Sequence, residues 1–277
     1  MTTPPGPTAP DAGAPRLRTE DRGQVRLLVL ENPSKRNALD FRALEELIAA
    51  CASAAAAAAR DEVRCVLLRG AGEEAFSSGF DLAELGGVNA RGERPDEAVE
   101  RAAEALEALP CPTVAYLNGP AYGGGFELAA TCDLRVAREG ILLGMPPAKL
   151  GVVYPEGGLR RFLQLVGGAR TRELFFAGRP IDAHVAHAWG LVNRLIPAES
   201  AEATALSLAQ EIACNAPLAV QGMKRILQLL ESAHERGLSG AEREEIGALR
   251  RRAFESEDIL EGRRAFAERR PPRFAGR

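Results

Sequence analysis

A carboxylate one turn into a helix that begins with glycines is the feature of this sequence best suited to chemistry. The apolar run Thr113 to Leu117 predicts a buried strand, and three glycines, Gly123 to Gly125, then open the predicted helix Phe126 to Ala130. Glycines at a helix start leave backbone N–H groups accessible, and the helix dipole favours negative charge there. Because helical side chains lean towards the N-terminus, Glu127 points to the same place. This pairing suits a reaction in which a base removes a proton while an adjacent carbonyl becomes an enolate.

A structural interpretation of the same residues is equally open at this point. A glutamate in the first turn of a helix suits the dipole and the capping geometry, whatever else it does. The glycines could serve only to let two backbones pack closely.

A second turn, Ser77 to Asp81, strengthens the functional interpretation because it too lies at a strand end, within the segment Ala75 to Leu82, which we predict to be a short strand leading into a tight turn. Two backbone N–H groups that are held separately and converge on one oxygen form an oxyanion hole. The loss of one such donor typically costs about 3–4 kcal/mol of barrier height.

The elements that must position these turns alternate between strands and helices. Apolar runs predict strands, and 3.6-residue periodicity predicts helices. The predicted strands are Gln24–Leu30, Val63–Arg69, Leu134–Ala137 and Ile141–Leu143, and the predicted helices are Phe41–Ala59, Glu97–Leu109, Gly157–Val166 and Thr171–Phe176. From residue 198 only helices are predicted, at Ala201–Asn215, Pro217–Ser232, Ala241–Phe254 and Ser256–Arg269. We therefore predict a disordered tail over residues 1–15, an α/β core over 16–197 and a helical region over 198–277.

The composition is that of a soluble globular protein. The 277 residues are 46% hydrophobic and 26% charged, with a net charge of −3, which does not favour nucleic-acid binding. No apolar run is long enough to span a membrane, and the N-terminus lacks the pattern of a signal peptide. The five cysteines are odd in number and show no C-x-x-C spacing, which favours reduced thiols in the cytoplasm.

Other site classes are disfavoured by the spacing of their residues. His184 and His187 are three residues apart, but no further ligand stands at metal-binding spacing, so we predict no metal. The glycine run does not match a dinucleotide-binding fingerprint, because Leu128 stands where the third glycine would fall. The arginines near the C-terminus are typical of a solvated helix end.

Five segments together resemble the enoyl-CoA hydratase/isomerase (crotonase) superfamily. In chain order they read NPSKRNALD, VRCVLLRGAGEEAFSSGFDLAEL, LPCPTVAYLNGPAYGGGFELAATCDLRVA, PPAKLGVVYPEGGLRRFL and ELFFAGRPIDAHVAHAWGLVNRL. The ending GRRAFAERRPPRF is also similar, so the resemblance runs from about Arg16 to the C-terminus. It implies an α/β spiral of ββα units with a C-terminal helical trimerisation region, assembled as a homotrimer or as a hexamer of two trimers. The implied ligand is an acyl-CoA thioester, as in fatty acid metabolism, with coenzyme A entering as part of the substrate and no separate cofactor.

The resemblance also implies the roles of individual residues. The oxyanion donors would be the N–H groups of Phe80 and Gly124, with Glu127 as acid/base. Positions that match the family's acyl-CoA contacts are Lys35, Arg36, Ala38, Ser78, Gly79, Asp81, Leu82, Tyr122, Gly123, Pro146, Pro147 and Leu150. Phe266 and Arg269 match C-terminal positions that can cover the adenine of a neighbouring subunit, and the C-terminal arginines could also contact the phosphates of CoA.

The main departure from the family pattern concerns a second glutamate. The segment Met145 to Gly151 resembles Q-P-E-x-x-x-G, with Pro147 in place of that glutamate. A syn-hydratase uses two carboxylates to position water and deliver a proton, and proline can do neither. Tyr154 resembles a tyrosine of the methylmalonyl-CoA decarboxylase branch, which however has His and Thr where this chain has Phe80 and Pro146.

Glu156 lies near the region where some enoyl-CoA isomerases place their single base. Packing for Tyr154 and helix capping for Glu156 are the structural alternatives. The resemblance thus implies a hydratase-like lyase, with isomerisation, decarboxylation and non-catalytic acyl-CoA binding as alternatives.

Overall fold

The computed structural model of the chain describes residues 16–234, 240, 244, 247–248, 251 and 254–270. The predicted tail over residues 1–15 and most of the predicted helix Ala241–Phe254 lie outside the described residues.

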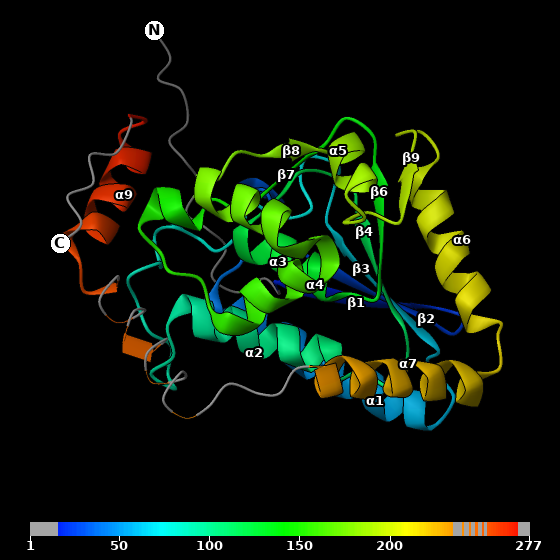
Figure 1. Cartoon of the computed structure of the whole chain (residues 1–277). Coiled ribbons are helices and arrows are strands. Elements are labelled where there is room, and N and C mark those ends of the chain that lie inside the picture. Colours follow the sequence, from blue (N-terminus) through cyan, green and yellow to red (C-terminus); the bar gives the residue numbers. More distant parts are fainter. Residues whose placement is uncertain are drawn as a thin grey trace, which may run out of the picture.

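A six-stranded sheet forms the centre of the protein, with the strand order β1-β2-β3-β4-β6-β9 (Figure 1). Within this sheet, as far as the structure describes it, only β1 and β2 pair antiparallel, and every later neighbour pairs parallel. The strands are β1 (Leu17–Arg22), β2 (Val25–Leu30), β3 (Cys65–Gly70), β4 (Thr113–Leu117), β6 (Leu134–Arg138) and β9 (Arg194–Ile196). A smaller sheet joins β5 (Ala121–Tyr122), β7 (Leu142–Gly144) and β8 (Ile181–Asp182), in that order.

Helices connect these strands and cover both faces of the large sheet. They are α1 (Phe41–Ala59), α2 (Pro95–Glu107), α3 (Gly123–Thr131), α4 (Glu156–Arg172), α5 (Ala183–Ala188), α6 (Ala201–Ala213), α7 (Pro217–His234) and α9 (Glu257–Ala267). Shorter helical turns occur at η1 (Pro33–Lys35), η2 (Pro147–Leu150) and the π-helical η3 (Glu173–Ala177). No helix in the described ranges is both long enough and apolar enough to cross a membrane.

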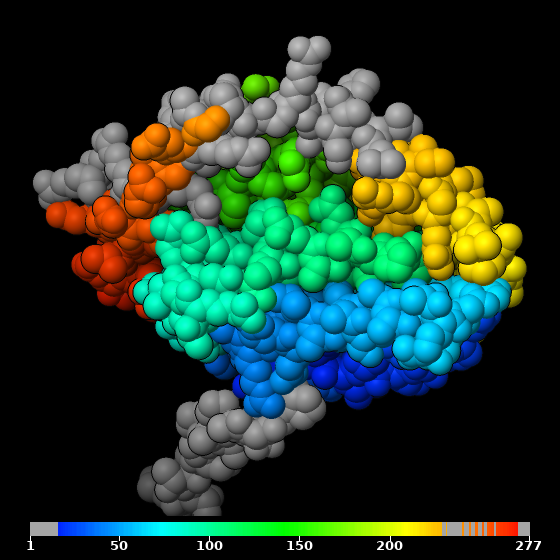
Figure 2. All heavy atoms as spheres, turned by 90° about the horizontal axis from the view of Figure 1, so that it is seen from below, coloured from blue at the N-terminus to red at the C-terminus, as the bar shows by residue number. Residues whose placement is uncertain are grey.

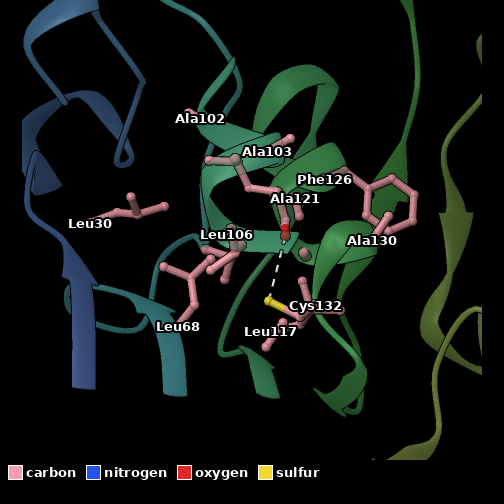
Figure 3. Packing of buried hydrophobic residues seen from close by; sticks show 14 of the residues in the cluster. Leu30, Leu68, Ala102, Ala103, Leu106, Leu117, Ala121, Phe126, Ala130 and Cys132 are labelled. Carbon is pink, nitrogen blue, oxygen red and sulfur yellow. Dashed lines mark hydrogen bonds between the residues drawn. The ribbon is translucent and has the colours of Figure 1, made fainter. Parts of the chain in front are cut away.

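The main core lies between one face of the sheet and α1, α2 and α3. Figure 3 shows Leu68 and Leu117 from the sheet packed near Leu106 of α2 and Phe126 of α3. At the end of α3 the buried Cys132 thiol donates a hydrogen bond to the carbonyl of Leu128 over 3.6 Å. This packing fixes α3, and with it the glycine run, against the carboxyl end of β4.

The opposite face of the sheet is covered by α6, the first helix of the predicted C-terminal region. Ala205 and Leu208 of α6 belong to the same buried cluster as Leu27 of β2 and Val114 of β4. Burial on both faces explains why the central strands read as continuous apolar runs.

Two further contacts position the site. Helices α1 and α2 lie side by side on one face, as the blue and green bands of Figure 2 show. Helix α9 approaches η2 so closely that a Cβ added at Gly262 would lie 2.8 Å from the carbonyl oxygen of Leu150. A glycine is therefore needed where α9 contacts this turn.

The predicted α/β fold with a helical C-terminal region is confirmed, whereas trimerisation stays a prediction. The sequence-based prediction missed β1, β5, β8 and β9. Strand β1 is polar and pairs only with β2, at the edge of the sheet, so it shows no apolar run. The short strand predicted at the start of the segment Ala75–Leu82 is wrong, because this segment forms only isolated bridges at Ser77 and Phe80.

Candidate active site

A cavity of about 950 Å³, here called the front cavity, opens where the two predicted turns meet η2 and α9. Most of the predicted site residues line it, and its walls are mainly apolar. The predicted residues in its lining are Arg36, Ser78, Gly79, Phe80, Leu82, Tyr122, Gly123, Gly124, Pro146, Pro147, Leu150, Tyr154 and Phe266.

The two turns are held together by backbone contacts. Ser77 pairs with Ala121 in a parallel bridge, and the N–H of Tyr122 donates to the carbonyl of Ser77 over 3.0 Å. Gly79 has φ +92°, and a Cβ there would approach the carbonyl oxygen of Tyr122 to 2.9 Å. Only glycine fits this junction, which brings Phe80 and Gly124 to one wall of the front cavity.

The N–H groups of these two residues are available to a ligand. Within the described ranges, the N–H of Phe80 donates to no protein acceptor, although its neighbours Gly79 and Asp81 both bond to Leu39. Gly124 is the second residue of α3, where helix geometry provides no intrahelical acceptor. The side chain of Phe80 packs edge-on against Phe41, with ring centroids 5.1 Å apart, which fixes the turn.

Glu127 is completely buried and does not line the front cavity. Its carboxylate accepts a hydrogen bond from the Tyr154 hydroxyl over 2.5 Å and another from Arg161 Nη1 over 3.0 Å. Burial raises the pKa of Glu127 to about 7, against the opposing effect of the bonds from Tyr154 and Arg161. Among the described residues that contact the carboxylate, Tyr154 is the one that lines the front cavity.

Tyr154 is held in place by aromatic packing and by a glycine. Its ring packs edge-on against Phe175 at 5.3 Å, and a Cβ added at Gly158 would lie 2.5 Å from Tyr154 Cε1. Burial, followed by the negative charge of Glu127, raises the pKa of Tyr154 well above its ordinary value. The phenol thus stays protonated and acts as a hydrogen-bond donor.

Arg161 of α4 connects Glu127 to two carboxylates of α2. Its Nη1 lies 3.0 Å from Glu127 and 3.2 Å from Glu100, and its Nη2 lies 3.1 Å from Glu107. Glu100 also accepts a hydrogen bond from the backbone N–H of Gly158 over 3.2 Å. We call Glu100, Glu107, Glu127 and Arg161 the ion cluster.

The sequence analysis missed the other three members of this cluster. The sequence feature that could have indicated them is the glycine pair Gly157 and Gly158 near a helix start. A Cβ added at Gly157 would lie 1.8 Å from Glu100 Oε1, so glycine is needed where Glu100 approaches the helix. Such a pair indicates the close approach of other side chains to a helix.

Other predicted residues lie outside the lining of the front cavity. The Nζ of Lys35 pairs with Asp81 over 2.6 Å, and Ala38 is buried. Glu156 is the first residue of α4, a position that suits the helix dipole. Arg269 is exposed, and the neighbouring Arg270 lines the front cavity instead.

Further residues in the front cavity were not singled out from the sequence. Val99 of α2 lies close to Gly124, where an added Cβ would approach its Cγ2 to 3.0 Å. Asp96, near the start of α2, brings a buried carboxylate to the lining, 3.6 Å from Arg94 Nε. Phe254 also lines the cavity, and the guanidinium of Arg94 lies over its ring at 4.5 Å.

Comparison with known proteins places this geometry in a family. The family model described as Enoyl-CoA hydratase/isomerase matches residues 20–277. Carnitinyl-CoA dehydratase of Citrobacter koseri is 36% identical over 78% of this chain and 83% of its own length. Methylmalonyl-CoA decarboxylase of Escherichia coli is 34% identical over the same shares of both chains. The crystal structure of methylmalonyl-CoA decarboxylase complexed with 2S-carboxypropyl-CoA superimposes with a TM-score of 0.85, at 30% identity, over 95% of this chain and 98% of that chain.

Proposed function

Because the chain belongs to the enoyl-CoA hydratase/isomerase family, we propose that it is an acyl-CoA enzyme that forms a thioester enolate in its front cavity. The N–H groups of Phe80 and Gly124 form the oxyanion hole for the thioester oxygen. The reaction that we propose is the decarboxylation of a 2-carboxyacyl-CoA.

The observation that carries this proposal is the bond between the Tyr154 hydroxyl and the Glu127 carboxylate. A phenol whose pKa is raised is a proton donor and not a base. Loss of carbon dioxide forms the enolate without a base and then needs a donor to protonate carbon. Tyr154 lines the front cavity and supplies that donor.

The proposed reaction consists of decarboxylation followed by protonation of the enolate. The bond between C2 and the carboxylate breaks, carbon dioxide leaves, and the electron pair moves to the thioester as an enolate. The two N–H groups stabilise the enolate oxygen, each by about 3–4 kcal/mol. Tyr154 gives its proton to C2, and Glu127 gives a proton to the resulting phenolate. Each turnover consumes one proton from solvent.

The walls of the front cavity support the same reaction. Phe80, Pro146 and Pro147 stand in its lining, and none of their side chains can donate a hydrogen bond to a carboxylate. A carboxylate placed against these three side chains, away from Arg36, Lys149 and Arg270 in the same lining, is less stabilised than in water, whereas neutral carbon dioxide loses nothing there. Pro147 also cannot provide the second carboxylate of a syn-hydratase.

Double-bond isomerisation or dehydration is the second candidate. It is supported by the pKa of Glu127, about 7, which suits a general base near neutral pH. Tyr154 would then have to turn aside to expose the carboxylate. The 36% identity to carnitinyl-CoA dehydratase supports this alternative as well. In a third possibility, a non-catalytic acyl-CoA binding protein, neither the base nor the oxyanion donors would be needed.

The proposal also covers cofactor use, cellular location and self-association. We propose that acyl-CoA binds without a separate cofactor and that the protein acts in the cytoplasm, in fatty acid or related acyl-CoA metabolism. We also propose self-association as a trimer or hexamer, supported by the exposed apolar side chains of Leu218, Met223, Ile226 and Leu227 on α7.

Incubation of the protein with an acyl-CoA panel in deuterated water, followed by mass spectrometry, tests the reaction. The panel holds methylmalonyl-CoA, crotonyl-CoA, a 3-enoyl-CoA and an aromatic enoyl-CoA. We expect methylmalonyl-CoA to lose carbon dioxide and to gain one deuterium at C2. Water addition to crotonyl-CoA or mass-neutral migration of a double bond, without carbon dioxide release, would replace decarboxylation by the second candidate. Tight CoA binding without turnover would favour the binding protein.

A further inference from the structure

One carboxylate is buried in the wall of the front cavity. The charged residues among the described lining residues are Arg36, Glu74, Asp96, Lys149 and Arg270. Asp96 is the one among them that is buried, with 7% of its side chain exposed. Arg36, Glu74 and Lys149 are exposed, so the other charges of the lining lie towards solvent. The interior of the cavity therefore carries a negative charge of its own.

Asp96 lies within one helical turn of the oxyanion hole. Asp96 and Val99 are three residues apart in α2, so their side chains are neighbours on one face of the helix. A Cβ added at Gly124 would lie 3.0 Å from Val99 Cγ2. The charge of Asp96 also reaches Tyr154, where it adds to the larger effects of burial and of Glu127 that raise the pKa of the phenol. Asp96 is thus close to the place where the acyl group reacts.

Capping of α2 does not account for the burial of Asp96. The next residue, Glu97, already accepts a hydrogen bond from the backbone N–H of Arg94 over 2.8 Å, and it keeps contact with solvent. An exposed acid favours the helix dipole equally well, without the hydration that a buried carboxylate loses. The burial of Asp96 therefore indicates a role in the cavity.

The carboxylate of Asp96 has the capacity to bind a ligand. Its Oδ1 lies 3.6 Å from Arg94 Nε, which is longer than a hydrogen bond. A carboxylate accepts about four hydrogen bonds, so Asp96 can bind a donor on a ligand in addition to its contacts within the protein.

We propose that Asp96 selects the acyl group of the substrate by accepting a hydrogen bond from a hydroxyl or ammonium group on the acyl chain. The inference rests on the proposed function, because it specifies the acyl-CoA that the same cavity takes: a 2-carboxyacyl-CoA whose chain carries such a donor. One helical turn is about 5.4 Å, which places the donor on the third or fourth carbon of the chain. Methylmalonyl-CoA has a plain methyl group there and reacts without this contact.

Calorimetry with three thioesters of nearly equal size tests the selection. Butyryl-CoA, 3-hydroxypropionyl-CoA and 3-aminopropionyl-CoA differ only in the terminal group, which is methyl, hydroxyl or ammonium. Asp96→Asn and Asp96→Ser both remove the charge, and serine is favoured at helix starts. Glu74→Gln removes the exposed carboxylate of the same lining and is the matched control. Circular dichroism establishes that each variant is folded.

We expect the native protein to bind the hydroxyl or the ammonium thioester about 10–100-fold more tightly than butyryl-CoA, as for a hydrogen bond to a charged group. This preference should disappear in both Asp96 variants and persist in Glu74→Gln, and the thioester that gains affinity identifies the donor. Equal affinity of the native protein for the three thioesters would overturn the selection. A preference that survives the loss of Asp96 would overturn it as well.

Failure of the proposed function has a separate measurement. If the native protein releases no carbon dioxide from methylmalonyl-CoA, decarboxylation is overturned, and the affinities for the three thioesters still decide the role of Asp96. Loss of water from 3-hydroxypropionyl-CoA, detected by mass spectrometry, would identify the second candidate function. The selection is then judged from the ammonium and methyl thioesters.

Discussion

The Tyr154 hydroxyl donates to Glu127 Oε2 over 2.5 Å and stands between this buried carboxylate and the front cavity. The two residues are 27 positions apart in the chain and are brought together by α3 and the loop before α4. In the proposed decarboxylation, this contact makes Glu127 the second member of a proton-donating pair instead of a base that faces the substrate. It also separates this site from one in which two carboxylates face the substrate.

Tyr154→Phe should abolish most of the decarboxylase activity while leaving CoA binding unchanged. The ring and its packing on Phe175 remain, but the proton donor is lost, and we expect kcat to fall by about 10²–10⁴-fold. Carbon dioxide release from methylmalonyl-CoA measures the rate, and calorimetry with CoA measures binding. Phe175→Leu, which removes the aromatic packing on Tyr154 but keeps its hydroxyl, is the control and should lose far less activity. Equal losses in the two variants would assign Tyr154 a packing role.

The pKa of Glu127 predicts how activity and stability depend on pH. Burial raises this pKa from 4.5 to about 7, so the native state holds a proton that the unfolded state releases between these values. The free energy of unfolding should therefore decrease as the pH rises from 4.5 to 7, by about 3 kcal/mol for this group, and change little above that. Activity should also decrease above pH 7, because an ionised Glu127 cannot recharge Tyr154.

Glu127→Gln provides the matched comparison for that pH dependence. The amide can still contact Tyr154 but has no proton to give up, so we expect turnover to be lost while CoA affinity remains. The decrease in stability between pH 4.5 and 7 should disappear, as measured by urea unfolding at several pH values. A variant that unfolds with the native pH dependence would show that another group causes it.

The residues that line the front cavity were easier to predict from the sequence than the buried residues behind them. Phe80 and Gly124 could be predicted because glycine turns at strand ends have a local signature, and both line the front cavity. Arg161 had no such signature, since an arginine in the run Leu159 to Phe162 is typical of a solvated helix face. Its role follows from the distance between α4 and α2, which only the tertiary structure sets.

Strand prediction failed for a similar reason. Strand β1 is polar, β5 and β8 have only two residues each and β9 has three, so none shows a periodic pattern. Their pairing depends on neighbours that are distant in the sequence.

Gly158→Ala should disturb the active site from within α4. The new Cβ would lie 2.5 Å from Tyr154 Cε1 and 2.9 Å from Glu127 Oε1, so the phenol must move. We expect a loss of about 1–3 kcal/mol in the free energy of unfolding. Turnover should decrease as well, because the Tyr154 hydroxyl is displaced from its position beside Glu127. In Gly222→Ala on α7, the new Cβ meets no atom of the described residues within 4 Å and should instead raise stability by about 0.5–1 kcal/mol. Thermal unfolding and turnover of both variants check the pair.

Arg161→Gln should destabilise the protein more strongly at pH 8 than at pH 5. At pH 8 Glu127 is ionised, and the change leaves its buried carboxylate without the guanidinium that also contacts Glu100; breaking such a buried pair costs about 3–5 kcal/mol. At pH 5 Glu127 is protonated, so less charge is left without compensation. Arg160→Gln, at the exposed neighbouring position, should change stability by no more than about 0.5 kcal/mol at either pH. Urea unfolding of the two variants at pH 5 and pH 8 measures these losses in the free energy of unfolding. If Arg161→Gln loses the same amount at both pH values, Glu127 stays ionised throughout and could not serve as a proton donor.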